Sequence, residues 1–309
     1  MTQPGRAPTV QLDASDPKIR AAIGRGTAAR AAARKRFYRI GCSAQVIWVV
    51  MPIVATRMIR SPNALLPFLS VWVIVFLVVV IRLLIGSASK WDAKNEFIKP
   101  LLSAAGLRYR PVGSVTAAQL DALHLFASRA RNSAFSADDE ISVEIRGVTV
   151  RLQELHTTVI TDERAAVVNL MQLEFNKYFR GHTVIWPRPE TSILRRSPLD
   201  NGRQVTMESA HFERAFVTFS TDDQQARYIL TPRMQELLFD AQRVAGQRMR
   251  VAFAANSMFV AAPGRDRFEE SVHSKIDVEW VLDDLNGLLS LADRLIDVLD
   301  LDLRIWTRE

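Results

Sequence analysis

The chain has 309 residues, of which 48% are hydrophobic and 24% charged, with 13 Gly, 13 Pro and one Cys. This composition excludes a disordered polymer, a collagen-like repeat and a small disulfide-stapled module. The formal net charge of +7 is unevenly placed: residues 1–39 hold nine of the 40 basic residues and two of the 33 acidic ones, so the rest of the chain is balanced.

Two apolar stretches follow this basic arm. Residues 40–56 contain no ionisable side chain except Cys42, and residues 61–81 contain none. A bilayer core about 30 Å thick requires about 20 apolar residues in a helix. The second stretch is therefore long enough to span a bilayer, whereas the first, with 17 residues, is expected to be a tilted span, a span in a locally thinned membrane or a re-entrant segment. Because only a short turn separates the two, we expect a transmembrane helical hairpin within residues 40–86.

Basic residues outside the hairpin predict its orientation. Residues 82–110 add six Lys and Arg to the nine of the N-terminal arm, whereas the connecting turn has only Arg57 and Arg60. Since Lys and Arg collect on the cytoplasmic side, we expect two spans in the inner (cytoplasmic) membrane, with both termini in the cytoplasm. Five basic residues near the first span are expected to contact lipid head groups: Arg30, Arg34, Lys35, Arg36 and Arg39. Nucleic acid attracts the same charges and is the disfavoured alternative.

Residues 87–135 are predicted to form juxtamembrane helices. Residues 90–105 have helical apolar spacing interrupted by Pro100, which indicates a kinked helix. A second helix is indicated by the capping-box spacing of Thr116 and Gln119, with apolar positions continuing to Ala130.

Residues 136–309 are predicted to form a soluble domain. Apolar residues alternate with a period of two on either side of Arg146 and Gly147, which is typical of a β-hairpin. Short turns between the later strand-like runs favour antiparallel pairing. These runs are residues 166–175, 182–186, 215–219, 249–254 and 258–262. The predicted fold class is α+β: the transmembrane hairpin is followed by a cytosolic antiparallel-sheet domain with packing helices.

Three helices are expected among or after these strands. One begins at the capping-box spacing of Thr221 and Gln224, and a second begins at Thr231, which precedes Pro232. The third has apolar residues at steps of three and four over residues 281–299. A membrane-surface role for this last helix is disfavoured because anionic lipid would repel its aspartates, which are Asp283, Asp284, Asp293 and Asp297.

Three stretches carry a family resemblance: residues 179–187 (FRGHTVIWP), 223–232 (DQQARYILTP) and 304–309 (RIWTRE). Together with the two apolar stretches, they resemble a bacterial membrane-protein family catalogued as domain of unknown function 3137. The likeness covers most of the chain from the first span onward, but residues 188–208 and the N-terminal arm depart from it. The resemblance implies an anchor followed by a cytosolic domain, with no assigned activity and no catalytic residues to carry over.

Glu154 and His156 are candidate binding residues. Positions 148, 150 and 152 of the predicted strand are apolar, so Glu154 and His156 continue the same inward-facing phase. An inward carboxylate beside an imidazole has shifted pKa values, and such pairs occur at functional sites. Two structural alternatives stay open, namely a bulge near Leu155 that turns both side chains outward and an ion pair internal to the domain.

Arg227 and Tyr228 are the other candidates, because a short helix could aim Arg227 at an anionic ligand or partner. The alternative is an Arg that ties its helix to a carboxylate of the sheet. No phosphate loop, nucleophile elbow, CxxC pair or metalloprotease motif is present, so we predict no catalytic residue, metal or cofactor. The predicted function is a non-enzymatic module that binds a ligand, a protein partner or a second copy of itself. The alternatives are a membrane-tethered enzyme using Glu154, His156 and Arg227, and a transport or channel component.

Overall fold

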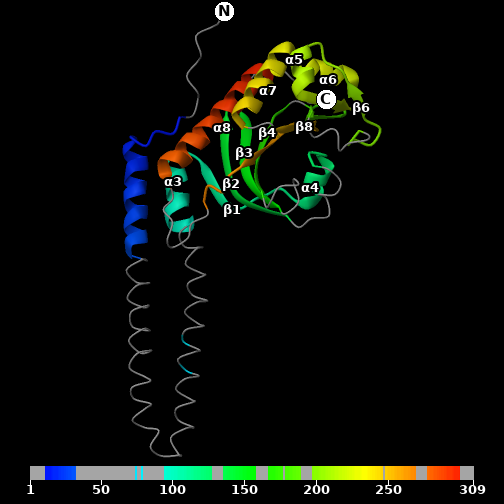
Figure 1. Cartoon of the computed structure of the whole chain (residues 1–309). Helices are drawn as coiled ribbons and strands as arrows, with labels where there is room; N and C mark the ends of the chain where they lie inside the picture. Colours follow the sequence, from blue (N-terminus) through cyan, green and yellow to red (C-terminus); the bar gives the residue numbers. More distant parts are fainter. Residues whose placement is uncertain are drawn as a thin grey trace, which may run out of the picture. The chain divides into compact units, whose positions relative to one another are not determined.

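The structure is a computed structural model that describes residues 11–32, 74, 78, 94–126, 135–157, 166–176, 178–188, 197–245, 248–268 and 277–299. The chain divides into two compact units (Figure 1). The first unit consists of residues 1–14, 106–267 and 277–309, and the second of residues 15–105 and 268–276.

The described part of the second unit is helical. Residues 17–32 form a helix, and η2 (Lys94–Ile98), a π-helical turn, leads into α3 (Lys99–Ala104). Pro100 lies in the first turn of α3, where its missing N–H needs no helical partner. A Cβ on Gly26 would lie 1.7 Å from the Phe97 ring, so glycine permits the close approach of the helix at 17–32 to η2. The predicted kinked helix is therefore a π-helical turn followed by a short α-helix.

The predicted membrane spans lie outside the described residues, apart from Ile74 and Val78. Both of these residues are helical and exposed. No helix within the described ranges combines the length and apolar character needed to cross a bilayer. Of the predicted lipid-contact residues, Arg30 lies in the helix at 17–32 and is half-buried, whereas Arg34, Lys35, Arg36 and Arg39 lie outside the described residues.

The described residues of the first unit form a nine-stranded antiparallel sheet with the order β1-β2-β3-β4-β9-β8-β5-β7-β6. The strands are β1 (Arg108–Val112), β2 (Phe135–Ile145), β3 (Val148–Thr157), β4 (Ala166–Glu174), β5 (His182–Pro187), β6 (Arg203–Val205), β7 (Phe216–Ser220), β8 (Arg250–Ala254) and β9 (Ser257–Gly264). The helices are α4 (Ala117–Ala122), α5 (Ala210–Ala215), α6 (Asp223–Ile229), α7 (Pro232–Ala245) and α8 (Val278–Leu299). The predicted α+β class with an antiparallel sheet is confirmed.

The two faces of the sheet have different partners. Leu155, Val168, Leu170 and Ala261 lie on one face and share an apolar cluster with Leu120 of α4. The residues between them in sequence lie on the opposite face, because successive side chains of a strand alternate. This second face lies under α7 and α8, which Figure 1 shows on the opposite side of the sheet from α4. Buried apolar residues of α8 include Leu285, Leu289, Ala292 and Ile296.

The β2–β3 hairpin turns at Arg146 and Gly147, whose φ angles of 51° and 79° are left-handed. Such angles at both central residues are typical of the tight turn that matches the twist of paired strands. The turn also contacts α8: Arg146 Nη2 lies 3.2 Å from Asp293 Oδ1, and Arg146 Nη1 lies 3.5 Å from Asp297 Oδ1. The C-terminal half of α8 is therefore held at the start of β3.

Helix starts differ from the prediction at one place. Thr116 caps α4 in the predicted capping box with Gln119, and the Thr231 hydroxyl accepts a hydrogen bond from the Met234 backbone N–H. The predicted cap at Thr221 is wrong by one residue. Asp222 caps α6 by accepting from the backbone N–H of Gln225, whereas Thr221 Oγ1 accepts from the backbone N–H of His182.

Candidate functional site

Glu154 lies near the end of β3 on the face covered by α8. Its register partners are Asp138 on β2 and Asn169 on β4. The pairing of β3 with β4 is continuous from Thr149 to Thr157, and the irregularity between β2 and β3 falls between Asp138 and Ile141 on β2. No bulge therefore turns Glu154 outward, and its side chain is 1% exposed.

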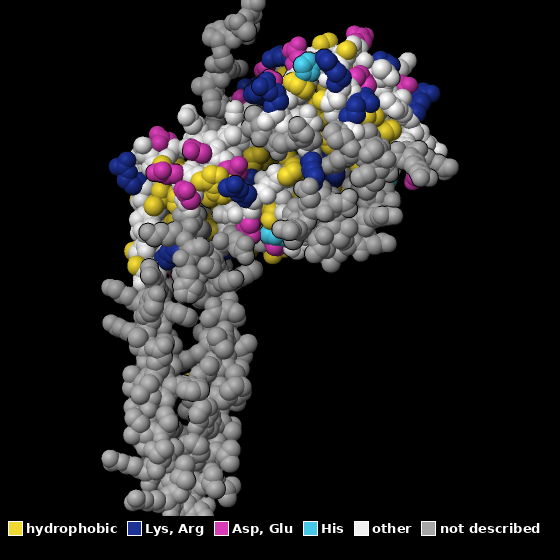
Figure 2. All heavy atoms as spheres, in the orientation of Figure 1, with side chains coloured by type: hydrophobic (Ala, Val, Ile, Leu, Met, Phe, Trp, Pro, Cys, Tyr) yellow, Lys and Arg dark blue, Asp and Glu magenta, His cyan; other side chains and the backbone are white. Residues whose placement is uncertain are grey.

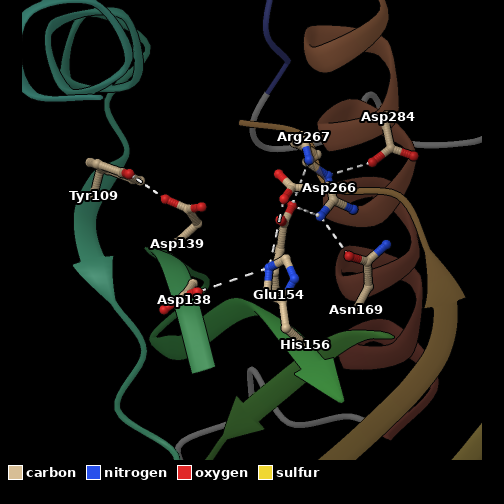
Figure 3. Close-up of polar contacts among 9 residues, drawn as sticks. All are labelled: Tyr109, Asp138, Asp139, Glu154, His156, Asn169, Asp266, Arg267 and Asp284. Carbon is tan, nitrogen blue, oxygen red and sulfur yellow. Dashed lines mark hydrogen bonds and ion pairs between the residues drawn. The ribbon is translucent and has the colours of Figure 1, made fainter. Parts of the chain in front are cut away.

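Arg267, just after β9, is the main partner of Glu154 (Figure 3). Glu154 Oε1 accepts hydrogen bonds from Arg267 Nη1 at 2.8 Å and from the Arg267 backbone N–H at 3.1 Å. The same guanidinium donates through Nη1 to Asn169 Oδ1 at 2.7 Å and through Nε to Asp284 Oδ2 at 2.6 Å. One buried cation thus joins β3, β4 and α8.

This network leaves two buried atoms unsatisfied. Glu154 Oε2 and Arg267 Nη2 have no hydrogen-bond partner among the described residues. Burial raises the pKa of Glu154 to about 7, although the charge and hydrogen bonds of Arg267 lower it, and Asp266 adds to the rise. Glu154 is therefore a buried carboxyl group in which only one of the two oxygens has hydrogen-bond partners among the described residues.

His156 and Asp266 lie next to this carboxyl group. His156 is two residues beyond Glu154 on the same face of β3, and its Nε2 lies 3.8 Å from Asp266 Oδ2 and 4.0 Å from Asp138 Oδ2. Figure 3 shows the side chains of Glu154, His156 and Asp266 directed toward one another. Each offers one ligand-type atom, and these three atoms all lie within 4.8 Å of one another. The arrangement could accept a cation or exchange a proton with solvent.

A second polar contact borders the cluster. The Tyr109 hydroxyl of β1 donates to Asp139, which is buried and has a left-handed φ of 51°. Burial raises the pKa of the Tyr109 hydroxyl, as do the hydrogen bond and charge of Asp139. Tyr109 is therefore a neutral hydroxyl group that donates to Asp139. The neighbouring Asp138 instead faces His156.

Arg227 and Tyr228 are exposed near the end of α6 and are not part of the network around Glu154. Thr221, just before α6, contacts the first residue of β5. The Thr221 backbone N–H donates to the His182 carbonyl at 3.0 Å, and the His182 backbone N–H donates to Thr221 Oγ1 at 2.8 Å. The segment before β5 carries Tyr178, which is 73% exposed. One of the stretches that carry the family resemblance, residues 179–187, thus contacts Thr221, two residues before the start of another, residues 223–232.

Trp186 belongs to the apolar core on the α4 side of the sheet. Its indole N–H donates to the His124 carbonyl at 3.1 Å, and the Arg250 guanidinium lies 4.9 Å from its ring centroid. The rings of His124 and His182 are 5.6 Å apart. Burial lowers the pKa of His182 to about 4, and the neighbouring His124 lowers it further.

Comparisons with known proteins give a match to a family model over part of the chain and a distant structural likeness. Residues 169–301 match the family model described as "Protein of unknown function (DUF3137)". The matched region includes Asn169, Asp266, Arg267 and Asp284 but begins after Glu154 and His156. No curated protein matches the chain. Among solved structures, the chain is similar to the crystal structure of the mycobacterial trehalose monomycolate transport factor A, TtfA, with 15% identity over 64% of this chain and 90% of that chain and a TM-score of 0.37.

Asp266, Arg267 and Asp284 were not predicted from the sequence. Arg267 is 113 residues from Glu154 along the chain, and no motif links the two. The one available signal was the inward phase of Glu154, which requires a buried partner of opposite charge somewhere in the chain.

Proposed function

We propose that this chain is a membrane-anchored, non-enzymatic module whose α+β domain binds a protein partner on the cytoplasmic side. The anchor is supported by the apolar stretches at 40–56 and 61–81 and by the basic residues on both outer flanks. Ile74 and Val78 agree with this assignment because both are exposed apolar side chains, which a bilayer would cover. The basic arm would contact anionic lipid head groups.

The observation that carries the binding proposal is a set of exposed tyrosine and arginine side chains on two segments, the residues before β5 and α6. Tyr178 is 73% exposed and Tyr228 is 54% exposed, and Arg180 and Arg227 are also exposed. Tyrosine and arginine are enriched among the residues that dominate protein–protein binding energy. Neither arginine forms an ion pair within the described residues, so we expect a partner with an acidic surface.

The enzymatic alternative has less support. It requires Glu154, His156 and Arg227 to act together, yet Glu154 is paired with Arg267, and Arg227 is exposed on α6. Nucleic acid also has little support from the described side chains, because Figure 2 shows acidic and basic ones intermingled on the visible face.

Site-specific photocrosslinking in membranes tests the binding surface. A photoreactive residue placed at position 178 or 228 of the full-length protein should yield a discrete adduct, and one placed at Arg243 of α7 should not. The added Arg227→Glu substitution should reduce that adduct by more than about tenfold if Arg227 contacts the partner, whereas Arg243→Glu should leave it unchanged. Equal adducts at all three positions, or an adduct of two copies of the chain, would contradict the proposal.

The anchor has a separate test. After carbonate extraction of membranes the full-length protein should stay in the pellet, and protease added outside intact spheroplasts should leave the C-terminal domain uncut. Release of the protein by carbonate would refute the two-span anchor without bearing on the crosslinking result.

A further inference from the structure

We propose that Glu154, His156 and Asp266 form a binding site for a divalent transition-metal ion, with Zn²⁺ as the best match. The three ligand-type atoms lie within 4.8 Å of one another and come from two separate segments, β3 and the turn after β9. One imidazole nitrogen with two carboxylate oxygens is a ligand set that zinc and its neighbours accept, and hard ions such as Mg²⁺ do not prefer the nitrogen.

The buried, unpartnered oxygen of Glu154 is the independent observation that indicates a ligand. Arg267 satisfies Oε1 through two hydrogen bonds, but Oε2 has no partner in the described structure and the side chain is 1% exposed. A buried carboxylate oxygen without a partner is costly. A metal ion between Oε2 and His156 would remove this cost.

The surrounding charges favour a cation. Asp138 is the direct cross-strand partner of Glu154, and like charges placed opposite each other destabilise an antiparallel pair. Asp266 adds a third carboxylate, and Asp284 a fourth on the other side of Arg267. Of these four carboxylates, Glu154 and Asp284 contact the Arg267 guanidinium and Asp138 and Asp266 lie near His156, so the site is acidic and a divalent ion would offset part of its negative charge.

The distances fit a site that closes on binding. Zn–N and Zn–O bonds of about 2.0–2.1 Å give a tetrahedral ligand separation of about 3.4 Å. The observed 3.8 Å between His156 Nε2 and Asp266 Oδ2 exceeds this by a few tenths of an ångström, and the other ligand pairs, all within 4.8 Å, exceed it by at most about 1.4 Å. Both of these side chains can shift because His156 is 33% exposed and Asp266 is 18% exposed, and the same exposure provides an entry path for the ion.

Bound metal would fasten the turn after β9 to the end of β3. Three protein ligands leave a fourth position, which Asp138 or water could occupy, since Asp138 Oδ2 lies 4.0 Å from His156 Nε2. The proposal does not depend on the partner surface at α6, which shares no residue with this site.

Zinc binding by the full-length protein tests the proposal. Detergent-extracted protein, with any affinity tag removed and metal stripped by EDTA, should bind one Zn²⁺ per chain by mass spectrometry of the metal, and zinc should raise its Tm. His156→Ala and Asp266→Asn should each weaken the affinity by more than about tenfold, because loss of an outer-shell partner alone costs about 10–100-fold. His211→Ala, at an exposed histidine of α5, should bind as the wild type does.

Three results would overturn the assignment. The first is a wild-type protein that binds no stoichiometric zinc. The second is zinc binding of unchanged affinity in both His156→Ala and Asp266→Asn, each shown to be folded by circular dichroism. The third is a preference for Mg²⁺ that His156→Ala does not alter. Glu154→Gln is not used as the primary variant, because the loss of its charge also removes the partner of Arg267.

Discussion

Replacing Arg267 with methionine removes the central cation of the network and retains an unbranched side chain of similar length. The arginine side chain is 3% exposed and donates to Glu154, Asn169 and Asp284. Breaking a buried ion pair costs about 3–5 kcal/mol, because the remaining charge is left without its partner. Glu154 already has a pKa of about 7, so proton uptake at neutral pH limits the loss to about 3 kcal/mol. For a domain of this size that corresponds to a Tm lowered by about 6–12 °C.

Thermal unfolding followed by tryptophan fluorescence, in EDTA so that no metal contributes, measures this change. The matched control is Arg151→Met, since Arg151 forms a 2.6 Å ion pair with Glu174 in which the side chains are 29% and 38% exposed. An exposed pair contributes about 0–1 kcal/mol, so the control should lose little stability. The double variant Glu154→Leu/Arg267→Met should recover most of the loss, because apolar replacement of a buried pair is often neutral. Equal losses in Arg267→Met and Arg151→Met, or no recovery in the double variant, would refute this account.

Three further changes test other parts of the first unit. Acidification from pH 7 to pH 4 should destabilise the fold through His182, because the unfolded side chain takes up a proton near pH 6.5 while burial keeps the folded one neutral down to about pH 4. Partial exposure reduces this effect to about 1–2 kcal/mol, and unfolding titrations should find it missing in His182→Gln and retained in His211→Gln. Leu289→Ala in α8, at a buried position, should cost about 2–5 kcal/mol in denaturant unfolding; a loss below about 1 kcal/mol would mean that α8 does not pack on the sheet. Gly264→Ala should cost about 1–3 kcal/mol, because its Cβ would lie 2.1 Å from the Asn169 side chain, and an unchanged Tm would contradict this.

The strands that alternate clearly in sequence were predictable, and the edge strands were not. The hairpin of β2 and β3 follows from the period of two around Arg146 and Gly147, and both residues have the left-handed angles that the turn needs. In contrast, β1 contains Pro111 and lies in the region for which the sequence predicts juxtamembrane helices. Proline is tolerated there because β1 is at the edge of the sheet and, among the described strands, pairs with β2 alone. The three residues of β6 are too few for any period to be detected.

The helix predicted from Thr116 to Ala130 is shorter than expected for a physical reason. Its capping box is present, but α4 ends at Ala122, and His124 adopts a left-handed φ of 50°. Leu125 and Phe126 then join the apolar core on that side of the sheet. The apolar spacing was therefore real, but burial of the side chains is achieved by a change of backbone direction rather than by a longer helix.

At the candidate site, the sequence indicated the direction of two side chains but none of their partners. The period of two placed Glu154 and His156 on the inward face, because alternation is a local property of a strand. The partners depend on which strands become neighbours. Asp266 reaches His156 only because β9 pairs with β4 and ends beside the start of that strand, where Val167 faces Gly264. Strand order is set by the whole sheet, so no local spacing could have predicted this meeting.

The aspartates of α8 are a second case in which the sequence pattern does not identify the partners of polar side chains. In sequence they look like the solvated side of an amphipathic helix, yet Asp284 accepts from Arg267, and Asp293 and Asp297 contact Arg146. Asp284 and Asp297 are separated by about 20 Å along the helix. Ion pairs near both ends of β3, to Arg146 at one end and to Arg267 at the other, hold α8 at one position along its axis. The helix position that places Asp284 beside Arg267 is therefore set by the acids at the margin of its apolar face.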